Sequence, residues 1–312
     1  MASSTPVSAS AESPPAAPSQ APVSASRDLA RRFARHKMAT ISVGILILLV
    51  LSVTLGTWFW HTSISDIDLA ASLQPPSWKH PLGTNDLGQD LLARMIYGGR
   101  ISLAVGVMAM LVSTVLGIIV GAAAGMSRGR TGPFLMWVTD VFLSLPQLPL
   151  LLLILYLFRD NLKQIFGVEG GVFVLVVAVI GGLRWMPIAR LVRAQFLSLR
   201  EKEFVEAAQA AGASRARLLW KHILPNAIGP VIVASTIEIS VAIIAESTLS
   251  FLGLGFPPDV PTWGRLLFEA KDYMAIAPYA ALIPGAAIFL TVLSVNFIGD
   301  GLRDAFDPRR VI

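Results

Sequence analysis

The sequence predicts an all-α integral membrane protein that crosses the bilayer six times and keeps both termini in the cytoplasm. Of its 312 residues, 54% are hydrophobic and only 14% are charged, which is too apolar for a soluble protein of this size. The apolar residues fall into six stretches, each long enough to cross a hydrocarbon core of about 30 Å. Basic residues crowd the connections that would lie on one side of the membrane.

Residues 1–26 and residues 27–60 form the first two parts of the chain. The first part is rich in Ser, Ala and Pro, so it cannot bury enough apolar surface to fold and is expected to be disordered. The second part begins with a basic stretch that carries Leu29 and Phe33 on one side. That pattern is typical of a helix lying against anionic lipid. The second part ends with the first predicted transmembrane helix.

The predicted spans follow the apolar runs. They are Ala39–Trp60, Ile101–Gly125, Pro133–Phe158, Val172–Ile188, Ala227–Thr248 and Tyr279–Gly299. Residues 61–99 are therefore an extracytoplasmic segment, and residues 100–301 are a five-helix core that includes a cytoplasmic hairpin at 200–226. Residues 302–312 are expected to form a cytoplasmic tail.

Two loops and four prolines interrupt the predicted core. Arg159–Gly171 and Phe251–Pro278 are expected to be outer loops. Prolines inside spans predict kinks at Pro146, Pro149, Pro187 and Pro284. Seventeen of the 25 Lys and Arg residues lie on the side assigned to the cytoplasm, seven lie outside, and Arg184 lies within a span. This bias orients the chain, and it explains the net charge of +5 better than a nucleic-acid partner would.

The hairpin between the fourth and fifth spans carries the strongest functional signal. Its alanines and Glu206 favour a short helix, and Gly212 allows the left-handed backbone that ends such a helix. A second helix is expected to run from Ser214, a suitable N-cap, to a break at Pro225. Small side chains on the first helix would let another protein approach its backbone closely.

The spacing of these residues resembles the EAA loop of ABC importer permeases. The matching residues are Glu206-Ala207-Ala208, then Gly212, then His222-Ile223-Leu224-Pro225 after nine more residues. That family places an isoleucine where this chain has His222. In the family the loop docks into the cytoplasmic ATPase subunit. The resemblance therefore implies ATPase-coupling roles for six residues: Glu206, Ala207, Ala208, Gly212, Leu224 and Pro225.

Three further stretches resemble dipeptide and oligopeptide permeases of the C type. They are HPLGTNDLGQD at 80–90, ESTLSFLGLGFPP at 246–258 with PTWG at 261–264, and NFIGDGLRD at 296–304. Gln89 stands where that family usually has an arginine. With the hairpin, the resemblance extends over about residues 27–309, in the family's order and on the family's sides of the membrane.

The resemblance implies a fold like that of type I ABC importer permeases and a role in ATP-driven import of dipeptides or oligopeptides. Glutathione and nickel complexes remain alternative substrates. The implied partners are a sister permease that completes a heterodimer, two ABC ATPase subunits, an extracytoplasmic substrate-binding protein and the lipid of the bacterial cytoplasmic (inner) membrane. The chain lacks a Gly-x-x-x-x-Gly-Lys-Ser/Thr sequence, so ATP is expected to bind the partner ATPases rather than this chain. No cofactor is expected on the chain itself.

Four ionisable residues lie inside predicted spans, where a charge costs roughly 2.5–3.5 kcal/mol at mid-bilayer. They are Asp140, Arg184, Glu238 and Glu246. Each is expected to face the bundle interior, water or a partner subunit, and Arg184 is a candidate to pair with one of the carboxylates. Structural pairing and contact with the translocated substrate both remain open. No metal site is expected, because Asn85, Asp86 and Asp90 lack the final glutamate of a calcium loop and fit a turn and helix cap better.

Two other classes of protein fit the residues less well. An intramembrane serine protease needs a serine and a histidine inside the bundle, but all four histidines lie at span ends or in loops. An aspartyl protease needs two membrane carboxylates brought together, and Glu238 and Glu246 lie eight residues apart on one helix. A passive channel would need no socket for an ATPase. The sequence therefore indicates a transport subunit and not an enzyme.

Overall fold

The computed structural model describes residues 25–127 and 129–307. The disorder expected for residues 1–26 falls almost wholly outside the described residues. Within them the chain forms helices and no β-strand, apart from one isolated bridge between Thr84 and Asp90. The helices are α1 (Ala25–Arg35), α2 (Lys37–Phe59), η1 (Leu69–Ala71), α3 (Leu91–Met126), α4 (Thr131–Ser144), α5 (Gln147–Gly182), α6 (Trp185–Arg200), α7 (Glu203–Ala210), α8 (Arg215–Arg217), η2 (Leu218–Ile223), α9 (Leu224–Phe251), α10 (Trp263–Ala270), η3 (Lys271–Tyr273) and α11 (Tyr279–Phe306).

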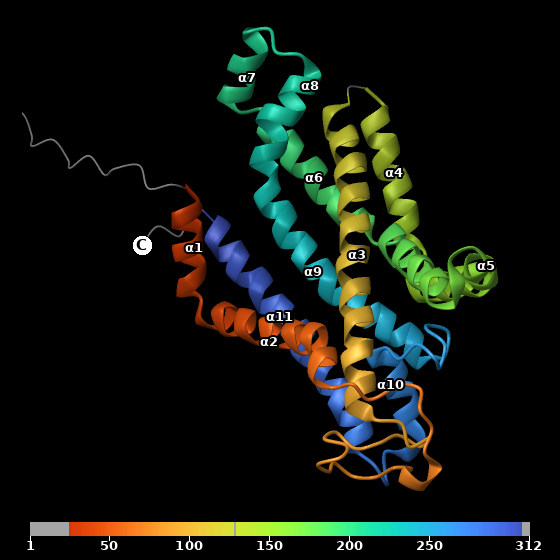
Figure 1. The fold of residues 1–312 in the computed structure, drawn as a ribbon. Helices are drawn as coiled ribbons and strands as arrows, with labels where there is room; N and C mark the ends of the chain where they lie inside the picture. Colours follow the sequence, from red (N-terminus) through yellow and green to blue (C-terminus); the bar gives the residue numbers. More distant parts are fainter. Residues whose placement is uncertain (1–24, 128, 308–312) are drawn as a thin grey trace, which may run out of the picture.

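Helix α3 is the central helix of the molecule and contacts α2, α4, α5, α6, α9 and α10 (Figure 1). Its packing against α6 depends on three glycines four residues apart: Gly117, Gly121 and Gly125. A Cβ atom added at any of the three would lie 2.5–2.6 Å from an atom of α6. Small residues at this spacing let two helix backbones approach closely. This glycine stripe therefore fixes α6, and the hairpin that follows it, against the central helix.

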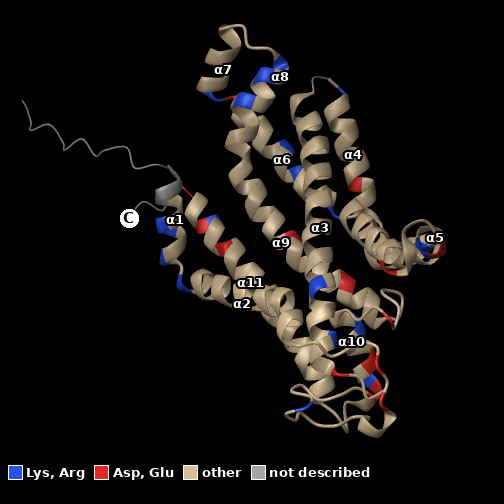
Figure 2. Cartoon of the chain, in the orientation of Figure 1, with Lys and Arg blue, Asp and Glu red and all other residues tan. Residues whose placement is uncertain are grey.

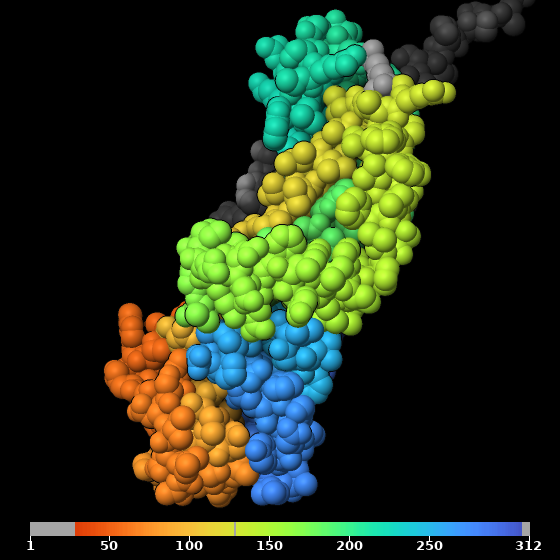
Figure 3. Space-filling view, turned by 90° about the vertical axis from the view of Figure 1, so that its right-hand side faces the viewer, coloured from red at the N-terminus to blue at the C-terminus, as the bar shows by residue number. Residues whose placement is uncertain are grey.

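The two ends of the molecule differ in composition. The hairpin of α7 and α8 projects past the ends of α3 and α4, whereas α10 and residues 60–90 gather at the opposite end (Figures 1 and 3). Lys and Arg residues lie at the hairpin end, and Asp and Glu residues are concentrated near α10 (Figure 2). Large apolar side chains between these ends are exposed, including Leu48, Ile119 and Leu157. An exposed apolar belt is the surface that a bilayer covers.

Five helices among the described residues are long and apolar enough to cross a membrane. The expected count of six spans stays a prediction. The boundaries of the third and fourth predicted spans are wrong, because the chain breaks inside each of them. Pro133–Phe158 divides into α4 and the start of α5, and Val172–Ile188 divides into the end of α5 and the start of α6. The kink expected at Pro146 is therefore confirmed, as a full break between α4 and α5.

The first break follows directly from proline chemistry. Leu145 precedes Pro146 and adopts extended backbone angles, because the proline ring disfavours helical geometry at the preceding residue. The outer loop expected at Arg159–Gly171 is wrong: this stretch is part of α5, which departs from helical geometry only at Gly167, with φ +77°. Residues 159–166 are helical up to that glycine, where a left-handed angle carries no Cβ penalty.

The second predicted outer loop, Phe251–Pro278, is partly helical, because α10 and η3 lie within it.

Helix α1, which was expected to lie against lipid, also contacts the end of α11. The ring of Phe33 approaches Gly301 of α11, where an added Cβ would lie 3.0 Å from the ring. Arg32 Nη1 donates to the backbone oxygen of Asp307 at 3.3 Å. The first helix is thereby fastened to the end of the last one. The tail expected at 302–312 begins as helix, since α11 continues to Phe306.

Candidate functional site

The hairpin has the helix, turn and helix order expected from the sequence. Helix α7 ends in a Schellman motif, in which Ala213 N donates to Ala208 O and Gly212 N donates to Gln209 O, both at 3.0 Å. Gly212 has φ +83°, so its predicted left-handed conformation is confirmed. Ser214 is confirmed as the next N-cap, because its Oγ accepts from Arg217 N at 3.3 Å.

Only one residue of α7, Val205, is buried. It packs in an apolar cluster with Leu218 and Ile223 of the following helix and with Phe196 of α6. The rest of α7 is open: Glu206, Ala207, Gln209, Ala210 and the adjoining Gly212 are exposed, and Ala208 is half-buried. Glu206 forms no ion pair with any described residue. The hairpin therefore presents a surface of small side chains with one carboxylate, supported from beneath by apolar packing.

The helix break expected at Pro225 is wrong. The chain stays helical from Arg215 to Phe251, and the strain is relieved in η2, a π-helical turn that widens the helix just before the proline. Leu224 N donates to Leu219 O, five residues back. Asn226 Nδ2 donates to His222 O at 2.6 Å. A proline inside a regular α-helix clashes with the carbonyl four residues earlier, and a π-turn moves that carbonyl away.

Continuity through Pro225 has a mechanical consequence. Leu224 and Pro225 do not end the hairpin but lie in the first turn of α9. The second helix of the hairpin and α9 therefore form one continuous helix, on which any displacement of the hairpin would act. The π-turn is the point at which that helix has its least regular hydrogen bonding.

Two of the ionisable residues inside the predicted spans meet at the middle of the molecule. Arg184 Nε donates to Glu238 Oε2 at 3.1 Å, and Arg184 Nη2 donates to Glu238 Oε1 at 3.3 Å. Arg184 Nη1 also donates to Gln147 Oε1 at 3.1 Å. Gln147 begins α5 and Arg184 precedes α6, so this polar clasp joins both helix breaks to α9. The Arg184 side chain is 24% exposed, which leaves one side of the clasp accessible.

Asp140 of α4 lies apart from this clasp and pairs with Arg190 of α6, with 2.5 Å between Oδ1 and Nη2. Both side chains are about half exposed. They border a hollow of about 280 Å³ that Met136 and Arg193 also line. Charges at this position are costly against lipid, so this face is suited to water or to a partner subunit. Arg190 could not be identified as the partner from local sequence, because the register between α4 and α6 is a tertiary property.

Glu246 is fully buried and meets hydroxyl groups instead of a cation. It accepts from Ser250 Oγ at 2.8 Å and from Ser102 Oγ at 3.3 Å. Ser102 also accepts from Trp263 N at 3.2 Å. These contacts tie α9 to α3 and to the start of α10. Glu246 and Arg184 are therefore not brought together.

The end opposite the hairpin is held by a second set of polar contacts. Asp90 caps α3 by accepting from Ala93 N at 2.7 Å, and it also receives Trp60 Nε1 at 2.9 Å and contacts His80 Nδ1 at 2.8 Å. The cap expected from the HPLGTNDLGQD stretch is confirmed. Asn85 adds the expected turn, because its Oδ1 accepts from Gln89 N at 2.8 Å.

The sequence alone did not single out Arg94 and Glu269, which lie at the centre of this network. Arg94 is buried and donates to Glu269 Oε2 at 2.9 Å and to Gln89 Oε1. Glu269 also accepts from Arg265 Nε at 3.1 Å. The pair joins the start of α3 to α10. We call residues 60–90 together with residues 252–278 the outer module. One feature of the sequence could have indicated that Arg94 joins this network. It lies four residues after Asp90, which places both residues on one face of α3.

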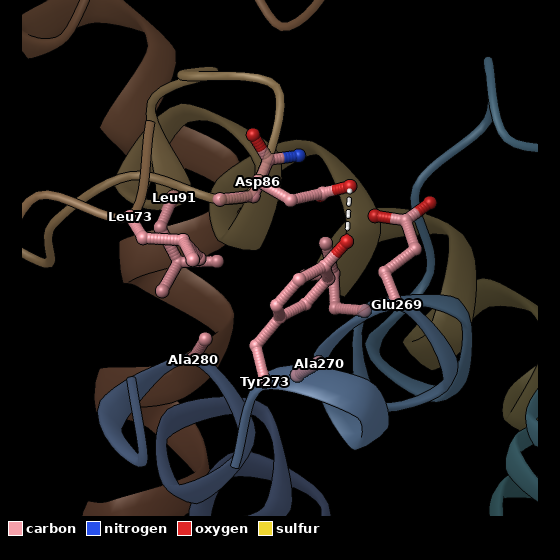
Figure 4. A pocket seen from close by; sticks show the side chains of 9 residues that line it. Leu73, Asp86, Leu91, Glu269, Ala270, Tyr273 and Ala280 are labelled. Carbon is pink, nitrogen blue, oxygen red and sulfur yellow. Dashed lines mark hydrogen bonds between the residues drawn. The ribbon is translucent and has the colours of Figure 1, made fainter. Parts of the chain in front are cut away.

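A small cavity lies inside the outer module, between Asp86, Glu269 and Tyr273 (Figure 4). The Asp86 and Tyr273 side chains point toward each other, with 3.5 Å between Oδ2 and Oη. The cavity volume is about 10 Å³, enough for one water molecule at most. It is thus a packing gap and not a peptide site. Among the described residues, no group of three or more His, Asp or Glu is placed to hold a metal ion.

Comparison with known proteins identifies similar chains. A family model described as "Binding-protein-dependent transport system inner membrane component" matches residues 113–312. A second, described as "N-terminal TM domain of oligopeptide transport permease C", matches residues 24–76. The oligopeptide transport system permease protein OppC of Haemophilus influenzae is 38% identical over 285 residues, which cover 91% of this chain and 88% of that protein.

Solved structures show the same fold at much lower sequence identity. One inward-facing crystal form of the MetNI methionine ABC transporter contains a chain with 19% identity and a TM-score of 0.54, covering 70% of this chain and 97% of that one. A second crystal form gives 18% identity and a TM-score of 0.55, with 70% and 98% covered. At these identities the likeness concerns the fold alone.

Proposed function

The chain belongs to the family of binding-protein-dependent transport system inner membrane components, and we propose that it carries dipeptides or oligopeptides inward through a path shared with a sister permease. As a member of this family it is a multi-pass permease subunit of an inner-membrane ABC transporter and not an enzyme. Its transport system includes ATPase subunits and a substrate-binding protein. The similarity to an oligopeptide permease supports the substrate class.

One observation carries the proposed coupling to the ATPases. The exposed face of Ala207, Ala210 and Gly212 is joined by a short turn to the helix that runs without a break from Arg215, through the π-turn, to Phe251. Small side chains allow close approach by a partner, and Glu206 can meet a basic or amide group on it. We place the ATPase socket against this face. ATP is bound and hydrolysed by the ATPase subunits, and this chain holds no cofactor of its own.

The long helix α9 suggests how ATPase closure reaches the substrate path. It carries Glu238 at the clasp with Arg184 and Glu246 at the contact with Ser102. A tilt of the hairpin therefore acts at both positions. Broken helices at membrane depth are tolerated where they are buried in protein or line a water-filled cavity. We therefore propose that the clasp of Arg184, Glu238 and Gln147, which is partly exposed only at Arg184 and Gln147, borders the path, and that Asp140 and Arg190 face the sister subunit.

The sidedness of the chain can be tested with single cysteines, because the chain has none. Six spans and cytoplasmic termini predict that Lys79→Cys reacts with an impermeant maleimide in intact cells and that Ser214→Cys does not. Both positions are exposed. Reaction at Ser214 in intact cells would reverse the proposed orientation.

Transport itself is tested by reconstitution of the full complex in proteoliposomes. ATP-dependent uptake of a labelled dipeptide and a labelled oligopeptide is expected only when the binding protein is present. Uptake of glutathione or a nickel complex in place of peptides would reassign the substrate.

Substitutions at Gly212 test the coupling separately. Gly212→Val should retain assembly but lose stimulation of ATP hydrolysis by loaded binding protein, because a β-branched residue is strained at φ +83°. Gly212→Asn is the matched control, since asparagine tolerates the left-handed region. Full peptide uptake by the Gly212→Val complex would contradict the coupling role and would show that the hairpin only connects two helices.

A further inference from the structure

The outer module carries one tryptophan whose side chain is not packed against the rest of the protein. Trp78 is fully exposed, and it lies in a loop of residues 75–79 that we call the tryptophan loop. Other large apolar side chains of the same module are also exposed, namely Ile67, Leu69, Met274 and Ile276. Exposed apolar side chains gathered on a module outside the spans mark an interaction surface.

The tryptophan loop is held at both of its ends. Before it, Gln74 N donates to Thr84 Oγ1 at 2.9 Å, and Tyr279 Oη donates to Gln74 O at 2.8 Å. Within and after it, Ser77 N donates to His80 O at 2.9 Å and His80 N donates to Ser77 Oγ at 3.1 Å. His80 is fixed in turn by buried Asp90.

Two adjacent prolines, Pro75 and Pro76, restrict the loop further. A side chain presented by a restrained loop loses little conformational freedom when it binds, and this raises affinity. Buried Trp residues are also among the commonest energetic centres of protein interfaces. The loop therefore has the properties of a preformed anchor.

Lipid is the alternative surface for an exposed tryptophan, and the chain already places other aromatic residues where lipid is expected. Trp58 and Phe59, both largely exposed, lie at the end of α2. Trp60 is tied to Asp90 at the start of α3, which sets the level at which both helices end. Residues 61–90 lie beyond that level, at the end of the molecule opposite the hairpin (Figure 1).

We propose that Trp78 is an anchor for the extracytoplasmic substrate-binding protein. The inference rests on the proposed function, since the family depends on such a protein and the proposed ATPase socket occupies the other end. Trp78 fills a pocket on the binding protein, and other exposed apolar residues of the outer module add to the contact surface.

The test measures the affinity of the assembled complex in nanodiscs for the binding protein. Trp78→Ala is expected to raise the Kd at least about tenfold, and Trp78→Phe to raise it less. Trp58→Ala is the matched control: its side chain is 73% exposed at the end of a span, and its loss should leave the Kd unchanged. An unchanged Kd in Trp78→Ala would overturn the proposal.

A second measurement keeps the proposal testable if Trp78→Ala does not assemble. A benzoylphenylalanine in place of Trp78 retains the aromatic bulk and should cross-link to the binding protein under light. Cross-links to lipid or to the sister permease alone would overturn the proposal. Uptake at saturating binding protein separates this idea from the proposed function. Trp78→Ala should still transport there, whereas absence of peptide uptake by the unaltered complex would refute the transport function itself.

Discussion

The hairpin and the outer module are stabilised in opposite ways. The hairpin contributes a single buried residue from α7, Val205, and leaves its polar groups exposed. The outer module buries polar residues, among them His80 and Asp90, which contact each other, and its Glu269 pairs with buried Arg94 of α3. Buried polar groups that are hydrogen-bonded to one another restrict the arrangements that a region can adopt. The hairpin end is thus held by few buried contacts, and the outer end is held by many polar ones.

Glu269→Leu should have the largest effect. The change leaves the buried Arg94 cation without its carboxylate, and breaking a buried ion pair costs about 3–5 kcal/mol. Amide hydrogen exchange in the outer module should accelerate accordingly in the purified complex. Glu206→Leu in the hairpin is the control and should leave exchange in the outer module unchanged. Equal effects of the two substitutions would remove the contrast between the two regions.

Two left-handed glycines sharpen the same contrast. At Gly88, with φ +73°, a Cβ would lie 1.8 Å from the backbone oxygen of Asp68. Gly88→Ala should therefore cost roughly 2–5 kcal/mol, from left-handed strain and overpacking together. At Gly212, with φ +83°, nothing lies within 4 Å, so Gly212→Ala should cost only about 1 kcal/mol. Thermal unfolding of the purified complex compares them, and a larger loss at Gly212 would contradict the structure.

The clasp between the two regions should respond to an intermediate degree. Glu238→Leu removes two hydrogen bonds from Arg184, which predicts a loss of about 1–3 kcal/mol. If the clasp borders the path, the rate of peptide uptake should fall even where assembly is normal. Glu238→Gln, which keeps the shape, should retain more stability than Glu238→Leu. Unaltered uptake by both variants would leave the clasp with a purely structural role.

The smallest effect on stability is expected at Asp140. Its pair with Arg190 is half exposed, and such pairs contribute about 0.2–1 kcal/mol. Asp140→Asn should thus leave thermal unfolding of the isolated chain nearly unchanged. Any large loss of assembly with the sister permease would then report a contact made between subunits. Co-purification of the two permeases measures it, and normal co-purification would argue against that contact.

The hairpin was predictable because its signals are local. Gly212 after an alanine-rich stretch and Ser214 before a basic one specify a C-terminal stop and an N-cap within a few residues. Asp90 as the cap of α3 is local in the same sense. Membership of the permease family was also predictable from the sequence, since four short motifs occur in the family's order.

The break at Pro146 was predictable from its proline, but the break at Leu183 and Arg184 and the ion-pair partners were not. Apolar length shows that a stretch can lie in a membrane, but not where a helix stops, so the break at Leu183 and Arg184 gave no hydropathy signal. Gly181-Gly182 just before it was the available hint. The helical continuity through Pro225 depends on a π-turn, which propensity does not reveal. The choice of Glu238 and not Glu246 as the partner of Arg184 depends on how α5, α6 and α9 are set against one another.

The docking of the hairpin is tested most directly by a cysteine at one exposed position. Ala207→Cys should react with maleimide in inverted membrane vesicles that hold the two permeases alone, and it should be protected when the ATPase subunits are assembled. Lys79→Cys on the outer module, labelled from its own side, should react equally in both cases. Protection confined to Ala207 is the predicted result. Equal labelling of Ala207→Cys with and without the ATPase subunits would contradict the proposed docking site.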